Sequence, residues 1–388
     1  MNRLMHGFPP QPQGQVTLTN WRSSPFNHWA FHHVREIIPS ADIANDRHAV
    51  KHLPSVPLPL REVRVEPDSG EPLTIEAFLQ ETDHDGFAIL LNGRLLYERY
   101  GNGMTEETPH ILMSVSKSML GLLAGVLVER KALDPERQVT DLIPELAGSA
   151  YKGASIRQLL DMRTGIAWDE DYLAKSGPIV EYRKATGWNP AGERPSDLRS
   201  FMQQLKSAGG SHNGPLHYVS PNTDLLGWVI ERATGSRYAD LMSEHLWKPM
   251  GAERGAYITV DRLGAPRAAG GMCVTLRDLA RVGQWMIDKG GARIDDIESK
   301  GDPKAWAAGD LAEYFPDLPL RYRSQWYVLE GEAPLLFGYG IHGQFLFVDR
   351  RNRIVIAKLS SQALPMDVAR IGLTLRAVSE IRKFLAQA

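Results

Sequence analysis

The chain lacks several patterns that mark particular classes of protein. It has one cysteine, Cys273, so no disulfide can form within the chain, and its formal net charge is only −2. A near-neutral chain offers no strong attraction for nucleic acid or an anionic membrane. No apolar run reaches the roughly 18 residues of a membrane span. Residues 1–14 lack a basic segment followed by an apolar run, so no signal peptide is expected. We therefore expect a cytoplasmic protein without nucleic-acid or membrane partners.

Common catalytic and cofactor-binding fingerprints are also missing. No Gly-x-Ser-x-Gly elbow is present, which argues against an α/β-hydrolase. Neither a phosphate-binding loop nor a dinucleotide-binding glycine motif occurs. His28 and His32 have the i, i+4 spacing of a metal-binding helix face, but no acidic or cysteine ligand lies near them. We expect neither a metal nor an organic cofactor.

The order of predicted elements indicates a mixed α/β (α+β) fold. Asn92-Gly93 separates two β-rich runs and predicts a hairpin, and the end of the chain is strand-rich. Helical spacing dominates the middle of the chain. We expect an antiparallel sheet flanked by helices and assembled from the two ends, plus a mostly helical second lobe. The predicted parts are an N-terminal extension without a strong core (1–75), a sheet domain (76–135 and 255–388) and a helical domain (136–254).

Ser114 and Lys117 begin an apolar stretch, Met113 to Val128, that predicts a buried helix. Side chains three residues apart on a helix share a face, with about 5–6 Å between their Cβ atoms. A buried lysine with a lowered pKa can take the proton of a serine hydroxyl and so activate it as a nucleophile. The motif alone is weak, because a capping serine and a solvated lysine commonly begin a helix.

Tyr218 lies between a glycine-rich loop and a predicted helix start. A tyrosine on such a loop can reach into a cleft, and beside a lysine it can shuttle a proton. The alternative is a tyrosine that merely packs the loop onto the helical lobe.

The order Ser114-x-x-Lys117, then Tyr218-Val219-Ser220, resembles the superfamily of penicillin-binding proteins and class C β-lactamases, which are serine hydrolases. The resemblance spans roughly residues 80–388. Within that superfamily the chain is most similar to nylon-oligomer hydrolases and carboxylesterases, and the similar stretches cover nearly the whole chain: 27–31, 112–118, 144–149, 169–172 and 340–344. The resemblance implies cleavage of short acyl esters or linear amides, and it implies a homodimer.

The third motif of that superfamily, Lys-Thr-Gly on a strand, is where this chain departs. The motif falls at Gly338-Tyr339-Gly340, which we prefer, or at His342-Gly343-Gln344. The first placement implies an oxyanion hole from the backbone N–H groups of Ser114 and Ile341, and the second replaces Ile341 by Phe345. Loss of the motif's lysine should weaken β-lactam binding, and Arg183 or His342 could replace its charge.

The resemblance also implies roles for individual residues. Ser114 is the expected nucleophile, Lys117 and Tyr218 move its proton, and Tyr172, Tyr339 and His342 are the expected substrate contacts. The predicted function is that of a serine hydrolase cleaving a small-molecule ester or amide through an acyl-enzyme. The alternatives are a β-lactamase or D-alanyl-D-alanine carboxypeptidase, and a catalytically silent binding protein on the same scaffold.

Overall fold

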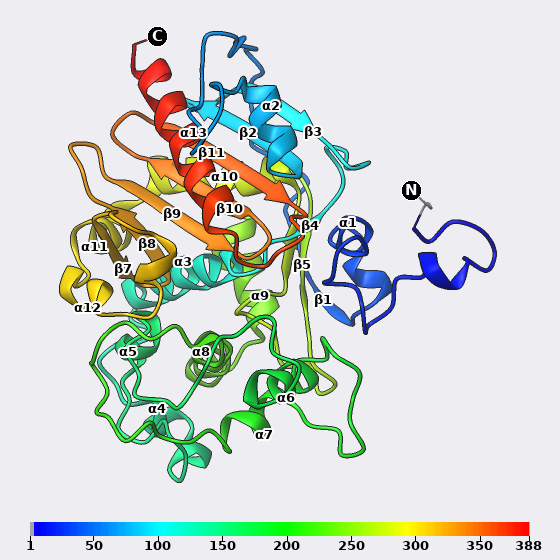
Figure 1. The fold of residues 1–388 in the computed structure, drawn as a ribbon. Coiled ribbons are helices and arrows are strands. Elements are labelled where there is room, and N and C mark those ends of the chain that lie inside the picture. Colours follow the sequence, from blue (N-terminus) through cyan, green and yellow to red (C-terminus); the bar gives the residue numbers. More distant parts are fainter. Residues whose placement is uncertain (1–3, 388) are drawn as a thin grey trace.

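A seven-stranded antiparallel sheet forms the upper half of the molecule (Figure 1). The computed structural model describes residues 4–387. The strand order is β3-β2-β11-β10-β9-β8-β7, so strands from both ends of the chain are neighbours. The bounds are β2 (His84–Leu91), β3 (Arg94–Tyr100), β7 (Leu320–Arg323), β8 (Trp326–Leu329), β9 (Leu335–Gly340), β10 (Gln344–Asp349) and β11 (Ile354–Ser360). This arrangement confirms the expected antiparallel sheet built from the two ends of the chain.

The hairpin between β2 and β3 has the turn that the sequence predicts. Asn92 and Gly93 have φ values of 53° and 76°, the left-handed backbone that a type I′ turn needs at both central positions. Every residue of β10 and β11 is buried, so both faces of these central strands are covered, rather than one face being buried and the other exposed.

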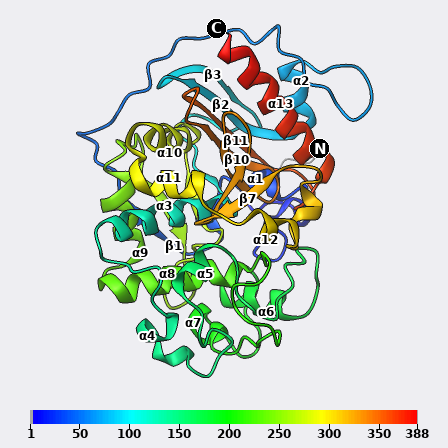
Figure 2. The ribbon, with the colours of Figure 1, turned by 90° about the vertical axis from the view of Figure 1, so that its left-hand side faces the viewer.

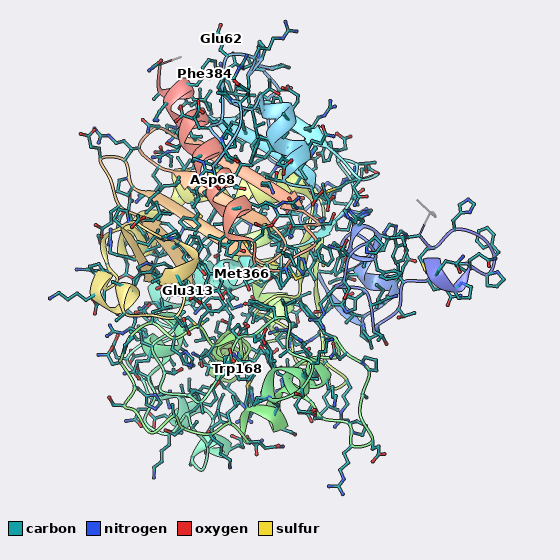
Figure 3. All side chains as sticks on the ribbon, viewed as in Figure 1. Glu62, Asp68, Trp168, Glu313, Met366 and Phe384 are labelled. Carbon is teal, nitrogen blue, oxygen red and sulfur yellow. The ribbon has the colours of Figure 1, made fainter. Side chains whose placement is uncertain are left out.

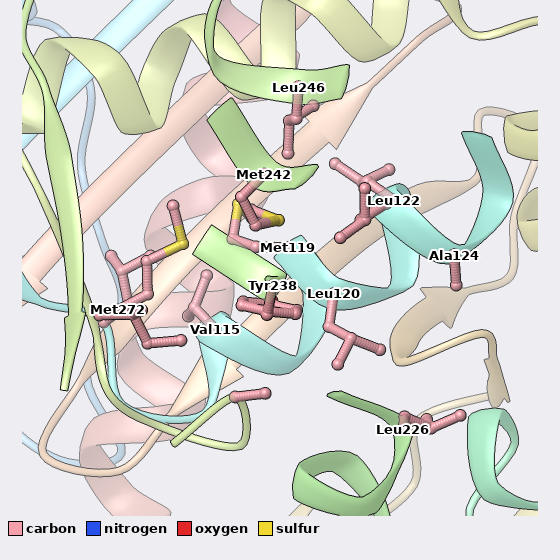
Figure 4. Close-up of a cluster of buried hydrophobic side chains, with 14 of the residues drawn as sticks. Val115, Met119, Leu120, Leu122, Ala124, Leu226, Tyr238, Met242, Leu246 and Met272 are labelled. Carbon is pink, nitrogen blue, oxygen red and sulfur yellow. The ribbon is translucent and has the colours of Figure 1, made fainter. Parts of the chain in front are cut away.

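Helices cover both faces of this sheet, which Figure 2 shows from the side. On one face lie α3 (Val115–Glu129) and α10 (Leu276–Lys289); on the other lie α2 (Ile75–Glu81) and α13 (Val368–Ala386). Helix α3 is buried nearly all round, and beyond its polar first turn it is mostly apolar, as expected for a helix enclosed by its neighbours. Figure 4 shows Met119 and Leu122 of α3 packed beside Met242 and Leu246 of the helical part of the chain.

The helical part of the chain lies below the sheet in Figure 1. It contains α4 (Val139–Leu142), α5 (Ile156–Leu160), α6 (Pro178–Ala185), α7 (Leu198–Met202), α8 (Ser220–Thr234), α9 (Tyr238–Met242) and the π-helical turn η4 (Ser243–Trp247). Residues 290–320, where the sequence predicts a loop-rich insertion, contain two further helices, α11 (Gly291–Ser299) and α12 (Pro303–Ala307). Asp302 caps α12 by accepting from two backbone N–H groups, a local signal that composition alone does not reveal.

The N-terminal segment carries more core than the sequence predicts. Strand β1 (Ser40–Ile43) pairs with β5 (Ala256–Thr259) in a second sheet, completed by β6 (Met272–Val274) and β4 (His110–Ile111). Before it, Trp21 and Phe31 are fully buried against residues far along the chain, with α1 (Asn27–Ala30) between them. Short 3-10 turns at Pro12–Gly14, Val34–Glu36, Pro144–Leu146 and Ala312–Tyr314 complete the structure. No helix among residues 4–387 is long and apolar enough to cross a membrane.

Candidate active site

Ser114 lies at the sharp turn between β4 and α3. Met113, just before it, has a φ of 46°, a left-handed conformation that a long side chain rarely adopts. Such backbone conformations persist only where the surrounding structure holds them, and they cluster at active sites. The turn places Ser114 at the N-terminus of α3, where unpaired backbone N–H groups favour negative charge.

Lys117 lies one turn along α3 and contacts the hydroxyl of Ser114. Its Nζ donates to Ser114 Oγ at 2.8 Å and to the carbonyl oxygen of Ala269 at 2.8 Å. Burial lowers the pKa of Lys117 to about 7, with a smaller contribution in the same direction from Arg267, while Glu170 and Asp224 oppose the shift. A lysine with this pKa is neutral often enough near pH 7 to accept the proton of Ser114.

Tyr218 faces the same pair from the loop that precedes α8. The Lys117 Nζ atom lies 4.8 Å from the centre of the Tyr218 ring. The backbone N–H of Tyr218 donates to the Asp310 carboxylate at 3.0 and 3.1 Å, which fixes the loop. Burial raises the pKa of Tyr218, against opposing hydrogen bonds with Ser114 and Tyr327. Its hydroxyl is therefore protonated at neutral pH and adjoins Ser114.

The end of β9 runs directly past Ser114. A Cβ atom on Gly340 would lie 2.6 Å from the Leu112 carbonyl oxygen and 2.9 Å from the Ser114 nitrogen, so only glycine fits. Ile341 follows at once and lines the same cavity as Ser114. Neither the Ser114 nor the Ile341 N–H has an acceptor within residues 4–387. Two free donors at one cavity are the arrangement that an oxyanion needs.

The two placements of the third motif differ in what they contact. Gly338-Tyr339-Gly340 lies on β9 against α3, whereas His342 and Gly343 form the following turn with φ values of 62° and 89°. His342 Nδ1 lies 2.7 Å from the Gln362 carbonyl oxygen, and burial lowers the pKa of His342 to about 4. Of the two, Gly338-Tyr339-Gly340 is the segment that adjoins Ser114.

A cleft with two compartments opens at Ser114. The inner compartment has a volume of about 30 Å³ and includes Ser114, Ile341 and three arginines in its lining. The outer compartment has a volume of about 390 Å³ and includes Tyr218. Tyr172 lines both. Figure 3 labels Glu313 and Met366, which line the outer compartment, at the level where the sheet meets the helical part.

The structure does not bring every expected substrate contact into this cleft. Tyr339 and His342 line neither compartment. The Tyr339 hydroxyl instead contacts the sulfur of Met366 at 3.3 Å, and the ring of His342 packs edge-on against Phe31 with 5.2 Å between ring centres. Tyr172 and Arg183 are the predicted residues that do lie in the cleft.

Sequence reasoning misses the charged residues that support Lys117. Asp224 accepts from the Ala269 N–H at 2.8 Å and pairs with Arg267 at 2.5 Å, and it thereby holds the backbone at Ala269, the residue whose carbonyl binds Lys117. Glu170 accepts from the Ser220 hydroxyl at 2.5 Å and from its N–H at 3.1 Å. Glu170 lies within a stretch that carries the family resemblance, but nothing in the local sequence marks Asp224.

Comparison with known proteins places this site in a family. Residues 74–379 match the family model described as Beta-lactamase. The chain is 38% identical to the 6-aminohexanoate-dimer hydrolase of Paenarthrobacter ureafaciens over 362 residues, covering 91% of this chain and 90% of the relative. It is 27% identical to esterase EstB of Burkholderia gladioli over 186 residues, covering 45% of this chain and 46% of that one.

A solved structure from Bacillus anthracis, provisionally named a 6-aminohexanoate-dimer hydrolase, superposes with a TM-score of 0.87 at 26% identity, covering 98% of this chain and 99% of that one. The D-alanine carboxypeptidase AmpC of Burkholderia cenocepacia shares the fold, with a TM-score of 0.55 at 16% identity, covering 79% of this chain and 96% of that one. These matches confirm the fold and the kind of enzyme that the motifs predict. The chain belongs to the beta-lactamase family and is a serine hydrolase of that family.

Proposed function

We propose that this enzyme hydrolyses small carboxylic esters, and linear amides of similar size, through an acyl-enzyme on Ser114. The observation that carries the proposal is the 2.8 Å contact between the buried Lys117 Nζ and Ser114 Oγ, at a cavity with two free backbone N–H donors. The kinship with a protein named 6-aminohexanoate-dimer hydrolase and the partial match to an esterase support both substrate classes.

The first half of the reaction forms the acyl-enzyme. Neutral Lys117 accepts the proton as Ser114 Oγ bonds to the substrate carbonyl carbon, and the N–H groups of Ser114 and Ile341 stabilise the oxyanion. The tetrahedral intermediate then collapses, and the bond from carbon to the leaving oxygen or nitrogen breaks. Tyr218, whose hydroxyl is protonated, donates to the leaving group and recovers its proton from Lys117.

The second half of the reaction releases the acid. Neutral Lys117 takes a proton from the water that adds to the acyl carbon, and Ser114 leaves with that proton restored. Tyr172 lines both compartments of the cleft and is our proposed contact to the bound substrate at the scissile bond.

Hydrolysis of 4-nitrophenyl butyrate by the wild type and by Ser114→Ala tests this proposal. We expect turnover by the wild type and a fall to the background rate in Ser114→Ala. Ser69→Ala is the matched control, because Ser69 is an exposed loop residue. A fluorophosphonate probe should label the wild type and Ser69→Ala but not Ser114→Ala. Retained activity or labelling in Ser114→Ala would show that another residue is the nucleophile.

The same assay separates the alternative functions. A β-lactamase would hydrolyse a chromogenic cephalosporin faster than the ester, and a carboxypeptidase would release D-alanine from a D-alanyl-D-alanine peptide. A silent binding protein would neither turn over an ester nor react with the probe. The hydrogen bond from Lys117 to Ser114 and the position of the Tyr218 ring beside Lys117 favour an active enzyme.

A further inference from the structure

Three guanidinium groups line the inner compartment beside Ser114. They belong to Arg22 of the N-terminal segment, Arg183 of α6 and Arg267 of the loop before β6. Arg267 is neutralised by Asp224, whose carboxylate lies 2.5 Å away. The other two arginines form no ion pair with any residue in the range 4–387, whereas the buried arginines Arg267 and Arg281 each have a carboxylate partner.

Both unpaired arginines are held by neutral acceptors. Arg183 donates to backbone carbonyl oxygens, including that of Tyr172 at 2.8 Å. Arg22 donates to Asn189 Oδ1 at 2.6 Å, and its buried Nε has no acceptor among the described residues. Burial, reinforced by the charges of Arg183 and Arg267, lowers the pKa of Arg22 to about 9. The arginines therefore repel one another and stabilise any anion that enters between them.

The arginines at the inner compartment outnumber the carboxylates, so the compartment carries a net positive charge. Against the three arginines stand two carboxylates, Asp224 and Glu170, and the second is already occupied by the hydroxyl and N–H of Ser220. The leaving group must face Tyr218, which lines the outer compartment and not the inner one. The acyl part of the substrate, on the other side of the scissile bond, then points toward the arginines.

We propose that the inner compartment binds a carboxylate on the acyl part of the substrate, so that the preferred substrates are monoesters or monoamides of short dicarboxylic acids. This inference rests on the proposed function, because it takes the orientation of the substrate from the roles of Ser114 and Tyr218. The compartment's volume of about 30 Å³ suits a group of carboxylate size. Guanidinium groups are the side chains best shaped to bind a carboxylate through paired hydrogen bonds.

Binding to the inactive Ser114→Ala variant tests the inference without requiring turnover. Three ligands of similar length are titrated by NMR-detected binding: monoethyl succinate (an anion), diethyl succinate (neutral) and ethyl 4-aminobutyrate (a cation). We expect the anion to bind at least about tenfold tighter than the neutral diester, and the cation to bind weakest. Added salt should reduce the preference for the anion.

The Arg22→Gln change in the Ser114→Ala background should remove most of this preference. Gln removes the guanidinium group that lies over Trp21 and Trp188 but keeps a polar side chain with part of the aliphatic stem, and a thermal melt checks that the fold persists. Arg137→Gln removes the same charge from a half-exposed site outside the cleft and should leave the preference intact. Equal affinity for the three ligands, or a preference that Arg22→Gln does not reduce, would overturn the inference.

Turnover separates this inference from the proposed function. If the wild type hydrolyses diethyl succinate as fast as monoethyl succinate, the hydrolase proposal stands and the anion pocket is wrong. If Ser114→Ala binds the anion selectively but the wild type hydrolyses no ester, the anion pocket stands and the hydrolase proposal is wrong. The preferred length of the substrate's acyl chain is determined by comparing the rates at which the wild type hydrolyses the monoethyl esters of malonic, succinic, glutaric and adipic acids.

Discussion

The lowered pKa of Lys117 predicts a specific dependence of activity on pH. Lys117 can accept a proton only when it is neutral, and its pKa is lowered to about 7. Below that value the neutral fraction falls about tenfold for each pH unit, so kcat/KM at pH 5 should be about a hundredth of its plateau. This acid limb of the pH profile, over which activity rises with pH, is measured from hydrolysis of 4-nitrophenyl butyrate between pH 5 and 9. The product is followed at the isosbestic wavelength of 4-nitrophenol and its anion, so that its absorbance does not depend on pH.

Glu170 offers a way to move this limb in a known direction. Its negative charge favours protonated Lys117 and so raises the pKa of the lysine. Glu170→Gln should therefore shift the acid limb to lower pH, because the change removes a charge that stabilises protonated Lys117. Glu193→Gln, an exposed change in the helical part, is the control and should leave the midpoint unchanged.

Two outcomes would refute this reasoning. Activity that stays constant from pH 8 down to pH 5 would mean that Lys117 is not the base that limits the reaction. A midpoint of the acid limb that rises in Glu170→Gln would mean that Glu170 lowers the pKa of Lys117 rather than raising it. A lower plateau in Glu170→Gln does not bear on the test, because the midpoint is read independently of the maximal rate.

Three further predictions concern single residues. Tyr218→Phe should lower kcat by about 10²–10⁴-fold with little change in the midpoint of urea unfolding, and an unchanged kcat would exclude Tyr218 as the proton donor. Gly340→Ala should lower kcat at least about tenfold and destabilise the fold by about 1–3 kcal/mol, because the added Cβ would lie 2.6 Å from a backbone oxygen. Gly331→Ala is the control: its Cβ would enter open space, so neither kcat nor stability should change. Cys273 is fully buried, and burial raises its pKa to about 12. A thiol reagent should therefore label Cys273 only as the protein unfolds, and rapid labelling of the native protein would contradict the buried position.

The sequence predicts those parts of the molecule that depend on local spacing. The helical repeat alone brings Ser114 and Lys117 together, and Asn92-Gly93 alone specifies the turn of the first hairpin. Strand β9 is harder to predict because Gly338 and Gly340 interrupt its β-rich pattern. These glycines are there because α3 lies against the strand: a Cβ on Gly338 would be 2.7 Å from Ser118 Oγ. The close packing of α3 against β9, which requires glycine at these positions, is visible only in the three-dimensional structure.

The charged surroundings of the site depend on contacts between distant parts of the chain. Arg22 binds the side chain of Asn189, 167 residues away, and Asp224 pairs with Arg267, 43 residues away. No periodicity links such partners, so their charges cannot be assigned to one cavity from the sequence. The residues that we propose to be catalytic can thus be located from a motif, whereas the residues that we propose to select the substrate cannot.

Arg22 lies outside the part of the chain that matches the family, which begins at residue 74. Trp21 anchors this segment by donating to the Trp188 carbonyl oxygen at 3.0 Å, so a stretch of chain that precedes the matched residues 74–379 completes the wall of the inner compartment. Selectivity and catalysis can therefore diverge separately in evolution. Exchanging residues 16–38 between relatives would be a compact way to engineer new substrate preferences while leaving Ser114 and Lys117 untouched.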